Sequence, residues 1–107
     1  MHHHHRPRRL LLALAWLLTA AAPGAWAQDA NLGRNLAATC ANCHGTNGNA
    51  RGEMKTLAGM PAAAIVTLMG EFKAGRLNPT IMHQVAKGYT EDQIKLVADY
   101  FAAQTRK

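Results

Sequence analysis

The sequence predicts an all-α fold made of short helices in one small domain. Two segments, residues 61–75 and residues 90–101, place apolar side chains at the i, i+3, i+4 and i+7 spacing of an amphipathic helix. No segment shows a convincing strand pattern of alternating apolar and polar residues. The stretch from residue 45 to residue 59 is rich in glycine and polar residues, which is typical of a loop. These observations favour several helices joined by loops, without a sheet.

Residues 1–27 have the organisation of a secretory signal peptide. Three arginines lie within residues 6–9, an uncharged apolar run covers residues 10–22, and the motif AWA at residues 25–27 leaves small residues at the cleavage positions. A membrane anchor needs about 20 apolar residues, and a Pro-Gly pair interrupts this run. We therefore expect cleavage after residue 27, export to the periplasm, and a mature domain of residues 28–107 that is not inserted into a membrane.

The charge and size of the mature chain limit its function. Three of the 12 Lys and Arg residues leave with the signal peptide, so nine remain against six Asp and Glu, a net charge of +3. This modest charge, together with export, gives no support to nucleic-acid binding. A domain of 80 residues has a marginal core and usually needs a disulfide, a metal or a bound cofactor to fold.

The first helix is expected to begin after Asn31, whose side chain is a suitable N-cap. Leu32, Leu36 and the turn that carries the two cysteines recur on one side of this helix. Gly33 lies on the same helix and has no side chain to obstruct a neighbour. We therefore expect the last helix to cross closely there, against Tyr100.

The two later helices carry their own start and stop signals. Pro61 suits the first helical position of one, and Gly75 ends that helix. Thr90 and Gln93 form a T-x-x-Q capping box that opens the other. The expected apolar faces consist of Ile65, Leu68, Met69 and Phe72 on the earlier helix and of Ile94, Val97, Ala98 and Phe101 on the last.

The motif CANCH sets Cys40 and Cys43 three residues apart, with His44 directly after them. A disulfide between these cysteines would close a very short loop and constrain the unfolded chain little. A structural zinc site needs four ligands, and a thioredoxin-like motif needs a βαβ setting; the sequence offers neither. Covalent attachment of a c-type haem uses this spacing, with thioethers at Cys40 and Cys43 and His44 bound to the iron. We therefore predict one haem c.

Three segments extend this prediction to a family. The segments NLAATCANCHGTNGNARGE, LAGMPAAAIVTLMGEFKAGR and TIMHQVAKGYTEDQIKLVADYFAAQ, all within residues 31–104, resemble the small class I c-type cytochromes. They resemble most closely the haem subunits of flavocytochrome c sulfide dehydrogenases. The resemblance implies the small class I cytochrome c fold, with about four to five short helices wrapped around one covalently bound haem.

The same resemblance implies two further site residues. In this family a methionine before the GY(S/T) turn binds the iron opposite the histidine, and that position is Met82 here. The family also often has a proline whose carbonyl orients the histidine, and this chain has Lys55 at that position. The backbone carbonyl of Lys55 can accept the same hydrogen bond.

The second axial ligand can also be argued from the residues alone. Four methionines remain after cleavage: Met54, Met60, Met69 and Met82. Met69 fits the apolar face of a helix, and Met54 and Met60 follow His44 by only 10 and 16 residues. Met82 follows His44 by 38 residues, after an Asn-Pro turn and a whole helix that can carry the chain to the other haem face. Met82 is therefore the predicted ligand. Three alternatives stay open: Met54 or Met60 as the ligand, Met82 as core filler, and His83 as the ligand with a lower reduction potential.

An iron bound by His44 and Met82 has no open position for oxygen or substrate. The sequence therefore predicts single-electron transfer rather than catalysis. The resemblance implies that the electrons come from the flavoprotein subunit of a sulfide dehydrogenase. The alternative is a free-standing soluble cytochrome c shuttle between respiratory or photosynthetic complexes. A haem sensor or peroxidase-like enzyme would need an exchangeable axial position. Five basic residues are candidates for steering an acidic redox partner: Arg51, Lys55, Lys73, Arg76 and Lys87.

Overall fold

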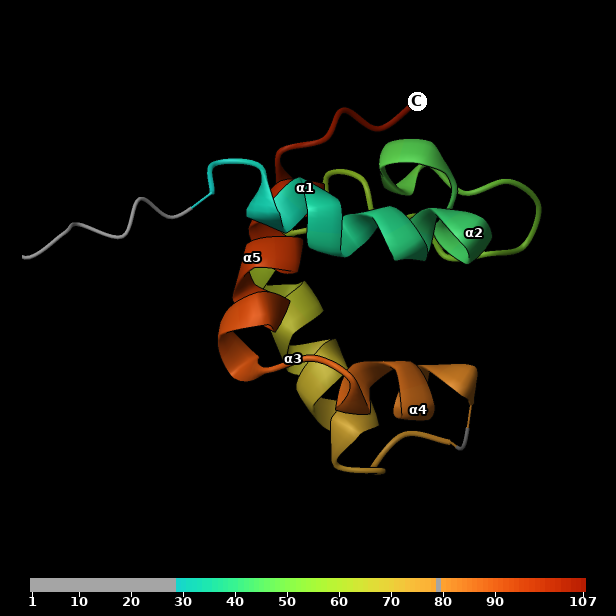
Figure 1. Cartoon of the computed structure of the whole chain (residues 1–107). Coiled ribbons are helices and arrows are strands. Elements are labelled where there is room, and N and C mark those ends of the chain that lie inside the picture. The colour runs from blue at the N-terminus through green and yellow to red at the C-terminus, as the bar shows by residue number, and fades with distance from the viewer. Residues whose placement is uncertain (1–28, 79) are drawn as a thin grey trace, which may run out of the picture.

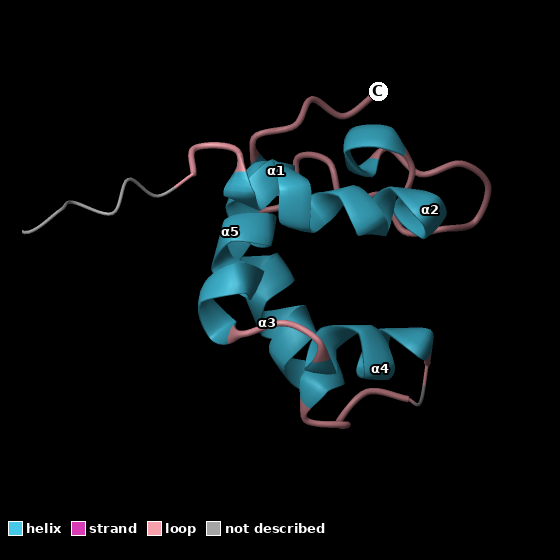
Figure 2. Ribbon diagram, in the orientation of Figure 1, coloured by secondary structure: helices cyan, strands magenta, loops and turns pink. Residues whose placement is uncertain are grey.

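The computed structural model describes residues 29–78 and 80–107. The proposed signal peptide, residues 1–27, lies outside the described residues, as does Pro79 of the Asn-Pro turn. The described chain forms α1 (Leu32–Ala37), α2 (Ala41–His44), α3 (Ala62–Lys73), α4 (Ile81–Lys87) and α5 (Glu91–Ala102). Two single 3-10 turns, η1 (Ala38–Cys40) and η2 (Thr46–Gly48), complete the list. Figure 2 shows no strand in this part of the chain, which confirms the all-α prediction.

The helices are arranged as two arms joined by a central pair. The segments α1, η1 and α2 follow one another without a break and form the upper arm, while α5 crosses α1 (Figure 1). Helix α3 packs on α5, and α4 packs on α3 as the lower arm. Both arms extend to the same side of the molecule. No helix in the described ranges is long and apolar enough to cross a membrane.

The apolar core is small and lies where α1, α3 and α5 meet. Among the described residues, its fully buried members are Ala37, Ile65, Val97, Ala98 and Phe101. Phe101 is the largest of them and is 1% exposed. Three of the other four are alanine or valine, so the buried apolar volume per residue is low. The core alone therefore gives the chain little stabilisation.

The crossing of α1 and α5 depends on Gly33. A Cβ atom added at Gly33 would lie 2.8 Å from the carbonyl oxygen of Leu96 and 3.7 Å from the Cβ of Tyr100. The first distance is shorter than real Cβ contacts, so only glycine permits this approach. The predicted close crossing is confirmed, with the backbone of Leu96 as the tightest neighbour.

Two predicted helix ends are confirmed. Thr90 Oγ1 accepts from the N–H of Gln93 at 3.2 Å, and Gln93 Oε1 accepts from the N–H of Thr90 at 2.9 Å, which is a complete capping box. Helix α3 ends at Lys73, and Gly75 follows with φ 72°. The N–H of Gly75 donates to the carbonyl of Phe72 at 3.0 Å and closes the last turn.

Three details of the predicted helices were wrong. Asn31 is the N-cap residue of α1 but makes no side-chain cap; its own N–H instead donates to Asp29 Oδ1 at 2.9 Å. Pro61 is the N-cap of α3, with ψ 132°, rather than its first helical residue. Leu68 is exposed and does not join the core, where α3 contributes Ile65 with its partly buried neighbours Ala62, Val66 and Met69.

Candidate functional site

Three predicted site residues of the CANCH motif, the two cysteines and the histidine, lie at the end of the upper arm. Cys40 closes η1 and is partly buried against the core, whereas Cys43 is exposed in α2. The two cysteines form no disulfide, and His44 is the last residue of α2. Burial raises the pKa of the Cys40 side chain above its ordinary value.

The orientation of His44 is set by a backbone carbonyl. Its Nδ1 lies 2.6 Å from the carbonyl oxygen of Lys55. Because a carbonyl oxygen only accepts, Nδ1 carries the proton and donates it, which leaves Nε2 with a free lone pair. The backbone carbonyl of Lys55 therefore makes the hydrogen bond that was expected of this position. A histidine held in this way is prepared to bind a metal through Nε2.

The loop after His44 folds back tightly and brings Lys55 to the histidine. Gly45 has φ 78°, and a Cβ atom there would lie 1.9 Å from the carbonyl oxygen of Asn49. The carbonyl of Gly48 then accepts from the N–H groups of Leu57 and Ala58, at 2.8 and 3.1 Å. These bonds fix the return path of residues 49–57 beneath α2.

Met82 lies in the first turn of α4, on the lower arm. The N–H of Met82 donates to Thr80 Oγ1 at 3.2 Å, which caps the start of the helix. Ala86, one turn later, is fully buried, and Met82 itself is half-buried. The neighbouring Ile81 is 71% exposed, and Val85 is also exposed. No separate helix was predicted for this segment, because seven residues between a turn and a glycine are too short to show a period.

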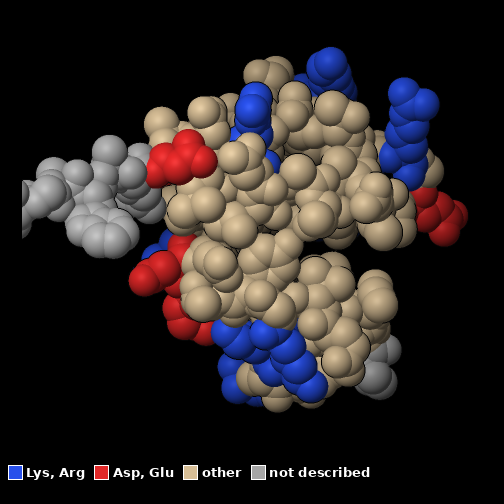
Figure 3. Space-filling model, viewed as in Figure 1, with Lys and Arg blue, Asp and Glu red and all other residues tan. Residues whose placement is uncertain are grey.

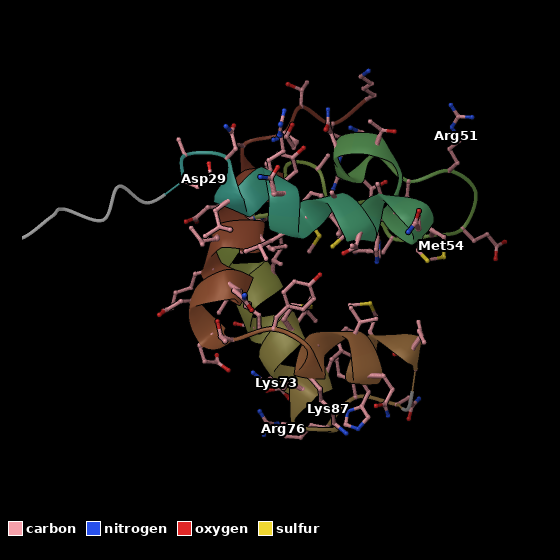
Figure 4. The ribbon with its side chains drawn as sticks, viewed as in Figure 1. Asp29, Arg51, Met54, Lys73, Arg76 and Lys87 are labelled. Atoms are coloured by element: carbon pink, nitrogen blue, oxygen red, sulfur yellow. The ribbon has the colours of Figure 1, made fainter. Side chains whose placement is uncertain are left out.

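The other three methionines occupy different surroundings. Met60 and Met69 are partly buried against the core cluster, as Met69 was predicted to be. Met54 is exposed and lies beside the end of α2 (Figure 4). It directly precedes Lys55, whose carbonyl is bonded to His44. Met54 is therefore on the same side of the site as His44.

His83 is directed towards α3. Its Nδ1 lies 2.6 Å from the carbonyl oxygen of Phe72, so this nitrogen also donates. A Cβ atom at Gly75 would lie 3.3 Å from His83 Cε1, which shows how closely the ring packs on the end of α3. The described ranges contain no cluster of three or more His, Cys, Asp or Glu side chains in position to hold a metal ion.

The space between the two arms fits a flat apolar group. Figure 3 shows the molecule hollowed between α2 above and α4 below. The upper arm presents two cysteine sulfurs and an imidazole whose Nε2 is not held by the Lys55 bond, which is the donor set for covalent haem attachment. Among the described residues, four large apolar side chains are exposed: Met54, Leu68, Ile81 and Val85.

Tyr89 connects the two halves at the closed end of the hollow. Its hydroxyl donates to the carbonyl of Leu36 at 3.3 Å and lies 2.9 Å from Thr39 Oγ1, just before Cys40. Its own carbonyl accepts from Lys73 Nζ of α3 at 2.7 Å. The turn after α4 is therefore tied to both the upper arm and α3.

The predicted basic residues form two groups. Lys73, Arg76 and Lys87 gather around the ends of α3 and α4, while Arg51 lies on the loop beyond α2 (Figure 4). Lys73 pairs with Glu91 at 3.2 Å, and Arg76 pairs with Glu71 at 2.7 Å. The hydrogen bond and charge of Arg76 hold the pKa of Glu71 below its usual value. Lys87 makes no such pair among the described residues.

Comparison with known proteins agrees with this geometry. A family model described as cytochrome c matches residues 30–104. The chain is 39% identical over 75 residues to the cytochrome subunit of sulfide dehydrogenase from Chlorobaculum tepidum, covering 70% of this chain and 68% of that protein. It is 36% identical over 64 residues to cytochrome c-552 from Acidithiobacillus ferridurans, covering 60% and 28%. It is 33% identical over 100 residues to the thiosulfate dehydrogenase electron acceptor from Thiomonas intermedia, covering 90% and 44%.

Proposed function

This chain belongs to the cytochrome c family and is an electron-transfer protein with one haem c attached through Cys40 and Cys43; we propose that His44 and Met82 are the two axial ligands of its iron. When bound, the haem supplies a one-electron couple between ferric and ferrous iron. With both axial positions filled by side chains, the protein passes single electrons and leaves no position for a substrate.

The arrangement of the two arms is the observation that supports this ligand pair. His44 extends from the upper arm with Nδ1 bonded to the Lys55 carbonyl, so Nε2 is the atom that would bind the iron. Met82 is the methionine of the lower arm, while Met60 and Met69 pack into the core. Met54 belongs to the side that already supplies His44. A thioether ligand favours the ferrous state, and apolar neighbours of the site raise the reduction potential further.

Substitution of the proposed ligand tests this assignment. Met82→Ala in the haem-loaded protein is expected to abolish the far-red sulfur-to-iron absorption band of the ferric form, because Met60 and Met69 pack against the core cluster. Met54→Ala is the matched control and is expected to keep the band, since Met54 lies on the His44 side. The measurement is the ferric absorption spectrum of both variants. Persistence of the band in Met82→Ala would move the assignment to another methionine.

We also propose that the mature chain works in the periplasm and accepts electrons from the flavoprotein subunit of a sulfide dehydrogenase. This part rests on the relative named as the cytochrome subunit of such an enzyme, of which the chain covers 68%. The signal-like residues 1–27 support export. The relative named as an electron acceptor of thiosulfate dehydrogenase supports the second candidate, a freely diffusing electron acceptor, although the chain covers only 44% of that protein.

Purification of the native protein separates the two candidates. A sulfide dehydrogenase subunit is expected to elute from size exclusion at low ionic strength together with a flavin-containing partner. The exported protein is expected to begin at Gln28. Low salt matters because any contribution of surface charge is screened over about 10 Å at 0.1 M salt. Elution as a flavin-free monomer would support the free electron acceptor instead.

A further inference from the structure

Helix α4 is too short to be stable without support from its neighbours. It has seven residues, whereas an isolated helix in water needs about 12–15 residues to be even marginally stable. Its N-cap, Thr80, directly precedes the helix, so the cap does not attach α4 to another helix. The position of α4, and of the Met82 side chain that it carries, must therefore be fixed by contacts with α3 and with the turn at Tyr89.

One side chain of α4 makes a hydrogen bond to another helix within the described residues. His83 Nδ1 donates to the carbonyl of Phe72 at 2.6 Å, a short contact in a partly buried setting. The acceptor lies in the last turn of α3, and its second lone pair accepts from the N–H of Gly75 at 3.0 Å. The ring of His83 also packs close to Gly75, with 3.3 Å from Cε1 to a Cβ atom built there.

From this contact we propose that His83 is a positioning residue for the iron ligand Met82. The inference rests on the proposed role of Met82. Consecutive residues of an α-helix point about 100° apart, so anchoring the His83 ring on α3 also fixes the direction of the Met82 side chain. Without that anchor the first turn of α4 can move away from α3, and the sulfur leaves the iron more often.

Competition with free imidazole tests this role in the haem-loaded ferric protein. Imidazole can replace the Met82 sulfur only in the fraction of molecules whose first α4 turn has opened, so its apparent Kd reports that fraction. His83→Ala removes one hydrogen bond, and we expect the apparent Kd for imidazole to fall about tenfold. His83→Asn keeps a nearby N–H donor and is expected to restore much of the wild-type value.

Gln84→Ala is the matched control, because Gln84 is the next residue of α4, is exposed, and has no side-chain hydrogen bond among the described residues. We expect this variant to bind imidazole as the wild type does. Equal imidazole affinity in His83→Ala and Gln84→Ala would overturn the proposed role of His83.

The far-red sulfur-to-iron band keeps this test separate from the assignment of Met82. Suppose that Met82→Ala loses the band and that His83→Ala retains it in the absence of imidazole. The ligand assignment then stands, and the imidazole titration decides the role of His83. If Met82→Ala retains the band, the proposed ligand is wrong and the positioning role falls with it. Loss of haem ligation in His83→Ala, with none in Met82→Ala, would make His83 itself the ligand and contradict both proposals.

Discussion

At the scale of single residues, two histidines make the same hydrogen bond and have different roles. His44 and His83 each donate from Nδ1 to a backbone carbonyl at 2.6 Å. The acceptor for His44 belongs to Lys55 in the loop, so this bond orients an imidazole at the open end of the upper arm. The acceptor for His83 belongs to Phe72 at the end of a packed helix, so this bond fastens α4 to α3. The two hydrogen bonds have the same donor atom, acceptor type and length, and they differ in the segment to which the acceptor belongs.

The group that orients His44 is a backbone carbonyl, so the hydrogen bond does not depend on the side chain at that position. Any residue type supplies the same acceptor if the loop has the right shape, so Lys55 can serve at the position where the resemblance implied a proline. The shape itself comes from Gly45 and Gly48, both at φ 78°. The side chain of Lys55 is exposed and takes no part in the bond to His44.

At the scale of helices, the crossing of α1 and α5 is the contact most sensitive to one added methyl group. Gly33→Ala places a Cβ atom 2.8 Å from the carbonyl oxygen of Leu96, which is helix backbone and cannot move cheaply. Overpacking of this kind costs about 1–3 kcal/mol. We therefore expect a lower midpoint of thermal unfolding for the haem-loaded Gly33→Ala variant, measured by circular dichroism.

The control for this prediction is Gly70, a helical glycine that, unlike Gly33, has open surroundings. A Cβ atom at Gly70 in α3 meets nothing within 4 Å, so Gly70→Ala is expected to gain roughly 0.5–1 kcal/mol from helix propensity. The two substitutions add the same methyl group and are expected to shift the unfolding midpoint in opposite directions. An unchanged or higher midpoint in Gly33→Ala would show that the helices separate without cost.

Features coded within a few residues could be predicted from the sequence, and features that need two distant segments could not. The capping box at Thr90 and the stop at Gly75 were predicted because capping is local. The cap at Asn31 failed because its backbone has φ −97° and ψ 1°, not the extended conformation in which an N-cap side chain reaches the first N–H groups of the helix. The bond from His83 to Phe72 spans two helices, so no local pattern contained it. The pairing of His44 and Met82 stays a prediction.

At the scale of the whole molecule, the fold has one closed side and one open side. The closed side is held by the small core and by Tyr89, which bonds to the upper arm through its hydroxyl and to Lys73 through its carbonyl. On the open side, the described helices α2 and α4 border the hollow seen in Figure 3. The exposed apolar residues Ile81 and Val85 belong to the lower arm. Under the proposed ligation by His44 and Met82, a covalently bound haem would complete the core and join the two arms.

The last prediction follows from this incomplete core. The double variant Cys40→Ala, Cys43→Ala cannot form either thioether, so the chain must fold around its few buried side chains alone. Small domains with so little buried apolar surface usually need a disulfide, metal or cofactor, and binding of such a group then supplies folding free energy. We expect the double variant to show no cooperative thermal transition by circular dichroism. The haem-loaded Met82→Ala variant keeps both thioethers and is expected to unfold cooperatively, and a cooperative transition in the double variant would show that the described helices are stable without the haem.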